Sequence, residues 1–306
     1  MASGGQMSPG PDSPANLKEL GHTALKWYIR HFPISKGKVR LANYLWKPLS
    51  SGQTHRQTVL KQADVRLACD LEQTIQRHIY FWGGYEEESC YHWIKLAQRS
   101  RVVFDIGANV GLYSLLAASA NPESKVYAFE PTPEMVTCLA DNIRLNDMPN
   151  VIVEPMAVGS HQGKAFLRLC SGSDGTNEGM NYVTYARQDD SDLPVQVTSL
   201  DGYCQDRRIG RIDLLKMDIE GGEYEALRGA QGLLRAQAID CIFLELIEWA
   251  AKRSGHSTTE IQMLLRGAGY HLYRVHSREL VPIAEGAFVD GENVIAFAGK
   301  LEPYPW

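Results

Sequence analysis

Val-Val-Phe-Asp-Ile-Gly-Ala-Asn-Val-Gly-Leu-Tyr-Ser occupies residues 102–114, and this stretch decides the fold. A short apolar run ends in an acid at Asp105, two glycines follow four residues apart, and an amphipathic segment begins after them. This order predicts a buried strand that turns sharply into a helix. We expect Gly107 and Gly111 to remove side chains where a ligand approaches the backbone.

A second acid strengthens the interpretation of this turn as a ligand site. The apolar run 126–129 ends at Glu130, 25 residues beyond Asp105. In nucleotide-binding α/β sheets, an acid at the tip of the second strand hydrogen-bonds the ribose hydroxyls. A tight strand–helix turn without any ligand is the alternative, and Glu130 counts against it.

The chemistry of the turn indicates which nucleotide it suits. The turn lacks both G-x-G-x-x-G and a Gly-Lys-Ser/Thr ending, which are typical of phosphate-binding loops. A carboxylate at Asp105 would repel a pyrophosphate, but it suits a ligand that carries an ammonium and a sulfonium. We therefore expect S-adenosylmethionine as the cofactor rather than NAD or ATP.

Composition narrows the class of protein. The 306 residues are 44% apolar and 22% charged, as in an ordinary globular enzyme, and the net charge of −5 gives no reason to expect nucleic-acid binding. No apolar run reaches the roughly 18 residues of a membrane helix, and the first 15 residues lack the apolar core of a signal peptide. The six cysteines show no C-x-x-C spacing, so we expect reduced thiols, no zinc site and a cytoplasmic location.

The chain divides into three predicted parts: a disordered tail over 1–15, a helical cap or extension over 16–83, and the main domain over 84–306. Residues 16–47 hold seven Lys or Arg against one acid, interleaved with aromatic and aliphatic residues, and two short helices are expected around the Phe32-Pro33 break. This segment is either a lid or homodimer element, or a surface for an anionic partner such as a membrane leaflet or a phosphorylated substrate.

The main domain alternates strands and helices, which predicts an α/β fold with a Rossmann-like, doubly wound and mostly parallel sheet. Seven strands are expected near residues 102–106, 125–129, 150–153, 212–217, 239–246, 270–275 and 293–298. Thr132 and Ser257 are expected to cap helices, with Glu260 completing a capping box. An extra strand pair is expected at 164–169 and 195–200, and the polar loop 171–181 between them is a candidate active-site lid.

A second acidic cluster follows the expected strand 212–217. Alternation places Lys216, Asp218 and Glu220 on one side of an extended chain, and Glu223 follows closely. Charge at the carboxyl end of a strand in an open α/β sheet favours a functional role. The alternative is an ion-paired strand end that caps the next helix, and Glu223 fits that description best.

These motifs carry a resemblance to a known family. They are Asp105-Ile-Gly-Ala-Asn-Val-Gly, Phe129-Glu130-Pro131 and Leu215-Lys216-Met217-Asp218-Ile219-Glu220-Gly221. They resemble motifs of the FkbM family of S-adenosylmethionine-dependent methyltransferases, and the likeness runs from about residue 84 to 297. The resemblance implies a Rossmann-like O-methyltransferase that acts on a hydroxyl of a sugar, glycolipid or polyketide-type small molecule.

Roles follow for the predicted site residues. Gly107, Asn109 and Gly111 are assigned to the methionine part of the cofactor, and Asp105 to its ammonium directly or through water. Glu130 is assigned to the ribose, the backbone of Met156 and Ala157 to the adenine, and Ala108 to cofactor binding without a specific part. Asp218, with Glu220, is expected to accept the substrate proton or to bind a divalent ion such as Mg²⁺ that acidifies the hydroxyl, while Lys216 positions them.

Three other functions compete with this one. The first is N- or carboxyl-methylation of a peptide or amine, and the second is a catalytically silent cofactor-binding module. An NAD-dependent oxidoreductase is disfavoured, because the acid of the first turn would meet a pyrophosphate.

Overall fold

The computed structural model describes residues 14–32, 36–50, 52–169, 181–187 and 189–299. Residues 1–13 of the predicted tail (1–15) and residues 171–180 of the predicted lid loop (171–181) lie outside the described residues. Two helices, a β-hairpin and two further helices come first: α1 (Pro14–His31), α2 (Lys38–Leu49), β1 (His55–Val59), β2 (Arg66–Asp70), α3 (Thr74–Trp82) and α4 (Glu87–Ala97). The helix pair around residue 33 is confirmed, and the extension contains a β-hairpin besides its helices.

The centre of the molecule is an eight-stranded sheet in the order β13-β12-β14-β11-β10-β3-β4-β5. Its strands are β3 (Val102–Ile106), β4 (Lys125–Phe129), β5 (Val151–Glu154), β10 (Ile212–Met217), β11 (Ile239–Leu246), β12 (Tyr270–His276), β13 (Glu279–Pro282) and β14 (Glu292–Ala298). The five strands from β5 to β11 are parallel, whereas β14 pairs antiparallel with both β11 and β12. All seven predicted strands are present, and the predicted count is one short because β13 folds back on β12 as a hairpin.

The predicted extra strand pair belongs to a second, four-stranded sheet. Its order is β6-β9-β7-β8, from β6 (Ala157–Val158), β7 (Gly163–Arg168), β8 (Tyr182–Thr184) and β9 (Leu193–Thr198). β7 and β9 pair antiparallel as expected, and β6 and β8 extend the pair on either side.

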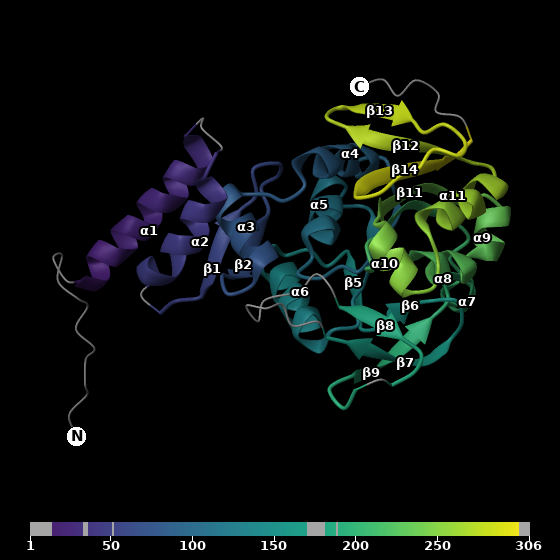
Figure 1. The fold of residues 1–306 in the computed structure, drawn as a ribbon, viewed down its shortest axis with the longest axis horizontal. Helices are drawn as coiled ribbons and strands as arrows, with labels where there is room; N and C mark the ends of the chain where they lie inside the picture. The colour runs from purple at the N-terminus through teal and green to yellow at the C-terminus, as the bar shows by residue number, and fades with distance from the viewer. Residues whose placement is uncertain (1–13, 33–35, 51, 170–180, 188, 300–306) are drawn as a thin grey trace.

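Alternating side chains of the central strands supply two separate cores. Val103 and Leu214 belong to the cluster that includes helices α5 (Leu112–Ala120) and α6 (Pro133–Leu145), whereas Phe104 and Leu215 belong to the opposite cluster. The opposite face is covered by α7 (Leu200–Arg207), α8 (Glu223–Arg228), α9 (Gln231–Arg235), α10 (Glu248–Arg253) and α11 (Thr258–Gly267). Helices on both faces make the sheet doubly wound, as predicted (Figure 1).

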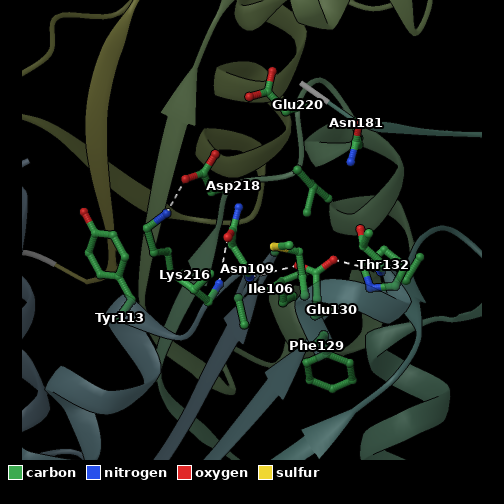
Figure 2. Close-up of a pocket in the computed structure, with 18 of the residues that line it drawn as sticks. Ile106, Asn109, Tyr113, Phe129, Glu130, Thr132, Asn181, Lys216, Asp218 and Glu220 are labelled. Atoms are coloured by element: carbon green, nitrogen blue, oxygen red, sulfur yellow. Dashed lines mark hydrogen bonds and ion pairs between the residues drawn. The ribbon is translucent and has the colours of Figure 1, made fainter. Parts of the chain in front are cut away.

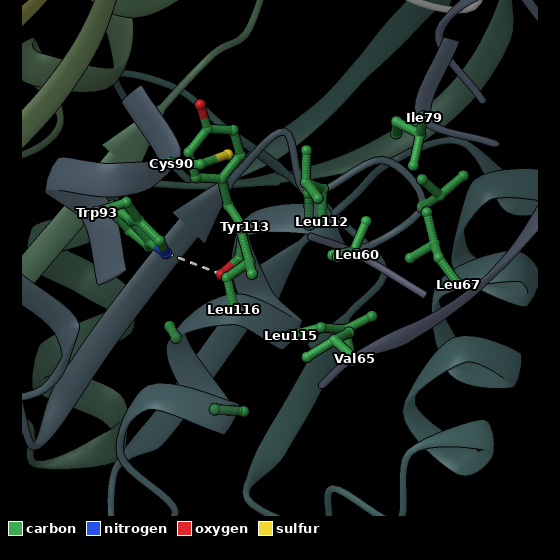
Figure 3. Packing of buried hydrophobic residues seen from close by; sticks show 14 of the residues in the cluster. Leu60, Val65, Leu67, Ile79, Cys90, Trp93, Leu112, Tyr113, Leu115 and Leu116 are labelled. Atoms are coloured by element: carbon green, nitrogen blue, oxygen red, sulfur yellow. Dashed lines mark hydrogen bonds between the residues drawn. The ribbon is translucent and has the colours of Figure 1, made fainter. Parts of the chain in front are cut away.

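The extension shares the first of these cores with the main domain. Figure 3 shows Leu60, Leu67 and Ile79 of the extension beside Leu112 and Leu115 of α5. All five side chains are at most 7% exposed. Burial of each such side chain contributes roughly 1.5–3 kcal/mol, so this contact holds α3 and the hairpin firmly against the sheet.

The two predicted helix caps differ. The Ser257 hydroxyl accepts a hydrogen bond from the Glu260 amide at 3.2 Å and donates to the Glu260 carboxylate at 2.9 Å, which confirms the capping box of α11. Thr132 precedes α6 as predicted, but its side chain makes no capping hydrogen bond.

Candidate active site

A cavity opens at the carboxyl ends of β3, β4 and β10 (Figure 2). Its volume is about 1200 Å³ when the part that is open to solvent is included. From β3 the sheet continues to β4 and β5 on one side, whereas β10 and β11 lie on the other side of β3. The cavity therefore lies where the strand order reverses. Open α/β sheets bind ligands at this position.

Nine of the eleven predicted site residues line this cavity: Gly107, Ala108, Asn109, Glu130, Met156, Ala157, Lys216, Asp218 and Glu220. Asp105 and Gly111 are absent from its wall, and each has a different place in the structure. The sequence therefore predicted which segments meet at the cavity, although two of the predicted residues do not line it.

The two glycines are required by contacts within the protein. Both have a positive φ, +85° for Gly107 and +95° for Gly111. A Cβ at position 107 would lie 2.0 Å from the carbonyl oxygen of Asp218, and one at position 111 would lie 2.5 Å from Leu139 Cδ1. Packing within the protein therefore requires both glycines, because Gly107 lets two strand ends approach and Gly111 lets α5 begin against α6; ligand approach at Gly107, which lines the cavity, stays a prediction.

Asp105 lies below the cavity wall. Its side chain is 1% exposed and accepts a hydrogen bond from the Ser114 hydroxyl at 2.6 Å. Burial raises the pKa of this carboxyl, and the neighbouring Lys216 ammonium opposes that shift. A side chain this deeply buried gives no support to a direct contact with a ligand ammonium, and the contact, direct or through water, stays a prediction.

Glu130 is held rigidly at the tip of β4. Its Oε2 accepts a hydrogen bond from the Asn109 amide and its Oε1 accepts one from the Thr132 amide, both at 2.8 Å (Figure 2). A carboxylate offers about four acceptor positions, so each oxygen keeps the capacity for a further bond. Burial raises the pKa of Glu130, and the two amides oppose the shift. The side chain is thus fixed in one orientation with acceptors left for a diol.

The opposite side of the cavity holds a buried ion pair. Lys216 Nζ donates to Asp218 Oδ2 at 2.6 Å and lies 4.3 Å from the centre of the Tyr113 ring. Burial lowers the pKa of Lys216, but the carboxylates of Asp218, Glu86 and Asp105 raise it more, so the ammonium keeps its charge. The Lys216 side chain is 3% exposed and that of Asp218 is 30% exposed. Asp218 thus faces the cavity while the lysine holds it from behind.

Glu220 departs from the predicted alternation. β10 ends at Met217, and Glu220 adopts a φ of +54°, so the chain is no longer extended at this residue. Figure 2 shows Glu220 apart from the Lys216–Asp218 pair. Burial, together with the charges of Asp218 and Glu223, raises the pKa of Glu220 to about 7.

Four more residues of this end were not assigned from the sequence. Tyr85, Glu86, Tyr113 and Glu245 all line the cavity. The Tyr113 hydroxyl donates to Glu86 Oε2 at 2.6 Å, and burial with the charges of Asp218 and Glu86 raises the pKa of Glu245 to about 8. Glu245 lies near the end of β11 and Glu86 directly precedes α4, but only the fold brings the two residues to one cavity.

The far end of the cavity is apolar. Phe129, Met135 and Val158 lie there with the predicted pair Met156 and Ala157. The flat faces of an aromatic base suit contact with such side chains.

Within the described part of the chain, no three His, Cys, Asp or Glu side chains are grouped so as to hold a metal ion. Lys216 Nζ occupies one oxygen of Asp218, where the sequence suggested a divalent ion. The Mg²⁺ prediction therefore gains no support from the structure.

The fold and this cavity define a Rossmann-like α/β enzyme whose cavity suits a nucleoside-bearing cofactor. Residues 105–272 match the sequence profile of the Methyltransferase FkbM domain, which is more than half of the chain. The chain belongs to the FkbM family of S-adenosylmethionine-dependent methyltransferases.

Individual relatives agree with this assignment. "Methyltransferase sdnD" of Sordaria araneosa is 30% identical over 168 residues, which cover 46% of this chain and 64% of the relative. "31-O-demethyl-FK506 methyltransferase FkbM" of Streptomyces tacrolimicus is 28% identical over 171 residues, covering 47% of this chain and 65% of the relative. The chain thus spans less than two thirds of the length of either relative.

Among solved structures, the S-adenosylmethionine-dependent methyltransferase from Agrobacterium tumefaciens is 9% identical with a TM-score of 0.42, over 80% of this chain and 70% of that one. A likeness of this size says nothing about the reaction.

Proposed function

We propose that the protein transfers the methyl group of S-adenosylmethionine to a hydroxyl oxygen of a sugar, glycolipid or polyketide-type small molecule. One observation carries the proposal: the Lys216–Asp218 pair, joined at 2.6 Å, faces the same cavity as the amide-fixed carboxylate of Glu130. A ribose-binding acid and a carboxylate suited to taking a proton thus share one site.

The cavity residues fit the cofactor. Glu130 has acceptor capacity for the two ribose hydroxyls, and the apolar wall at Met156 and Ala157 suits adenine. The turn at Gly107 and Asn109 would hold the methionine part. When bound, S-adenosylmethionine supplies a methyl group on a positively charged sulfur, which is open to attack by a nucleophile.

Asp218 would accept the proton of the attacking hydroxyl through Oδ1. Its Oδ2 is held by Lys216, and Oδ1 makes no hydrogen bond within the described residues. A carboxylate is a weak base toward an alcohol, so correct placement must supply much of the rate. Glu245, with its pKa raised to about 8, is mostly protonated at neutral pH and would donate a hydrogen bond to another oxygen of the acceptor.

A relative supports oxygen as the acceptor atom, since the Streptomyces enzyme is named for a 31-O-demethyl substrate. N-methylation of an amine is the second candidate. Besides Glu130, the acids Glu86, Asp218, Glu220 and Glu245 line the cavity, and the charge of those that are ionised would attract an ammonium group. The product separates the two, because a methyl ether and a methylamine differ in mass-spectrometric fragmentation.

Methyl-labelled S-adenosylmethionine and fractionated glycan, lipid and small-molecule acceptors test the proposal. We expect label in a hydroxyl-bearing fraction, with Asp218→Asn reducing kcat at least about 100-fold, in line with loss of a general base. S-adenosylhomocysteine affinity should stay within severalfold. Asp190→Asn, on a fully exposed side chain, is the matched control. Full activity of Asp218→Asn, or label only in amines, would contradict the proposal.

A further inference from the structure

The outer face of α1 is apolar although it is exposed. Leu17, Leu20 and Trp27 are 63%, 65% and 61% exposed, and their spacing places them on one side of the helix. The opposite side is buried: His22 donates to or accepts from the Tyr80 hydroxyl at 3.1 Å, and Ile29 is 1% exposed. The three exposed side chains therefore have no role in holding α1 to the body.

α2 presents a similar outer face with positive charge. Arg40, Tyr44 and Lys47 are exposed and follow one another at helical spacing, and Tyr44 is 80% exposed. Ala42 and Trp46 form its buried side. Figure 1 shows α1 and α2 side by side at the end of the molecule away from the central sheet. We call Leu17, Leu20, Trp27, Arg40, Tyr44 and Lys47 the outer face.

The charge around this face is not balanced locally. Glu19 is the single acid within residues 16–47, and its carboxylate is bound by Arg56 at 2.6 Å. Arg30 and Lys38 turn to backbone carbonyls of the protein, whereas Lys18, Lys36, Arg40 and Lys47 are exposed. The outer face is therefore apolar and cationic at once, in a chain whose net charge is −5.

We propose that the outer face binds the surface of an anionic lipid membrane. Interfacial helices place Trp and Leu at the boundary of headgroups and acyl chains, with Lys and Arg paired to anionic headgroups. A soluble phosphorylated partner would match the charge, but it would leave Leu17, Leu20 and Trp27 exposed. In the described residues, no helix is long and apolar enough to cross a bilayer, so the contact is peripheral.

The outer face is one helix away from the cavity. α1 packs on α3 through the His22–Tyr80 contact, and Arg30 also donates to the Tyr80 carbonyl at 2.9 Å. Ile75 and Ile79 of the same helix α3 line the cavity. Membrane contact would therefore bring the cavity within reach of a lipid-bound acceptor. The inference itself does not depend on methyl transfer, because lipid binding is measured separately.

Cosedimentation with vesicles tests the proposal. The full chain should bind phosphatidylcholine vesicles that contain phosphatidylglycerol, bind pure phosphatidylcholine at least tenfold more weakly, and dissociate at high salt. Arg40→Gln with Lys47→Gln should weaken binding roughly 30-fold, since each basic residue near an anionic surface contributes roughly fivefold. Leu20→Ser with Trp27→Ser should also weaken it at least tenfold.

Matched controls lie on other exposed elements. Lys125→Gln with Lys164→Gln and Met263→Ser with Phe288→Ser change charge and apolar exposure by similar amounts elsewhere. These variants should bind as the parent does, and all variants should keep its melting temperature. Absence of binding, equal binding to neutral vesicles, equal loss in the controls, or a dimer in sedimentation that the outer-face variants dissociate would overturn the proposal.

Discussion

Replacing Glu130 by glutamine tests the cofactor end of the cavity. Each carboxylate oxygen accepts one backbone amide at 2.8 Å, from Asn109 and from Thr132. In Glu130→Gln one oxygen becomes an NH₂ group, so a donor faces a donor wherever that group is placed. The side chain must rotate or leave one amide unpaired, and its orientation toward a ribose is lost.

The magnitude follows from the hydrogen bonds that the glutamine cannot make. A hydrogen bond to a charged group contributes roughly 1.5–3 kcal/mol, which corresponds to a loss of roughly 10- to 150-fold in affinity for S-adenosylhomocysteine. A buried amide left unpaired costs roughly 1–3 kcal/mol of folding free energy. We expect both effects in the same variant, because one carboxylate serves both.

Isothermal titration calorimetry with S-adenosylhomocysteine measures the loss of affinity, and urea unfolding measures the loss of folding free energy. Glu134→Gln, at an exposed position four residues further on, is the control and should alter neither by more than a few tenths of a kcal/mol. Unchanged affinity in folded Glu130→Gln would refute the assignment of Glu130 to the ribose. Weakened affinity without loss of stability would instead refute the dual role of the carboxylate.

Three other predictions concern the cavity and the buried residues beside it. Lys216→Met should lower kcat about 100-fold in a methyl-transfer assay, because Asp218 loses the ammonium that holds it, while S-adenosylhomocysteine affinity stays within severalfold. Burial raises the pKa of Glu223 from 4.5 to about 7 in the folded protein. The preference for the protonated carboxyl therefore contributes fully to stability below pH 4.5, and this contribution is lost as the pH rises through 7. The unfolding free energy should fall by roughly 2–3 kcal/mol between pH 5 and 8 from this group, and Glu223→Gln should flatten that part of the urea-denaturation profile. Gly107→Ala should cost at least about 2 kcal/mol in the same assay, because its Cβ would meet the Asp218 carbonyl oxygen at 2.0 Å; a smaller loss would mean that the two strand ends can separate.

The central sheet could be predicted because its signals are local. Each buried strand is a short apolar run, and the acids that end β4 and follow β10 mark the carboxyl edge. Glu130 and Asp218 were found in this way, and both line the cavity. β13 and β8 were missed, since short edge strands with mixed polarity have no periodicity to detect.

Contacts between distant segments could not be read from local patterns. The Tyr113 hydroxyl donates a hydrogen bond to Glu86, which is 27 residues earlier in the sequence. Glu86 also adopts a φ of +47°, which its residue type does not predict. The burial of Asp105 could not be predicted for the same reason. Only the packing of α5 brings the Ser114 hydroxyl to its carboxylate, at 2.6 Å.

The cavity wall is built from two parts of the chain. Glu130, Lys216 and Asp218 fall within residues 105–272, the span that matches the family profile, whereas Ile79 and Glu86 precede it. The family match therefore spans the residues proposed for cofactor binding and proton transfer, while another part of the cavity wall precedes the matched residues.

This division has a consequence for specificity. Changes at Ile75, Ile79 and Tyr85 should alter the choice of acceptor and its KM, because these side chains line the cavity and none of them contacts the amides that fix Glu130. Affinity for S-adenosylhomocysteine should be unchanged in such variants. If Ile79→Ala instead weakened cofactor binding as much as Glu130→Gln does, the cofactor would reach the α3 wall, and the two ends assigned to the cavity would have to be exchanged.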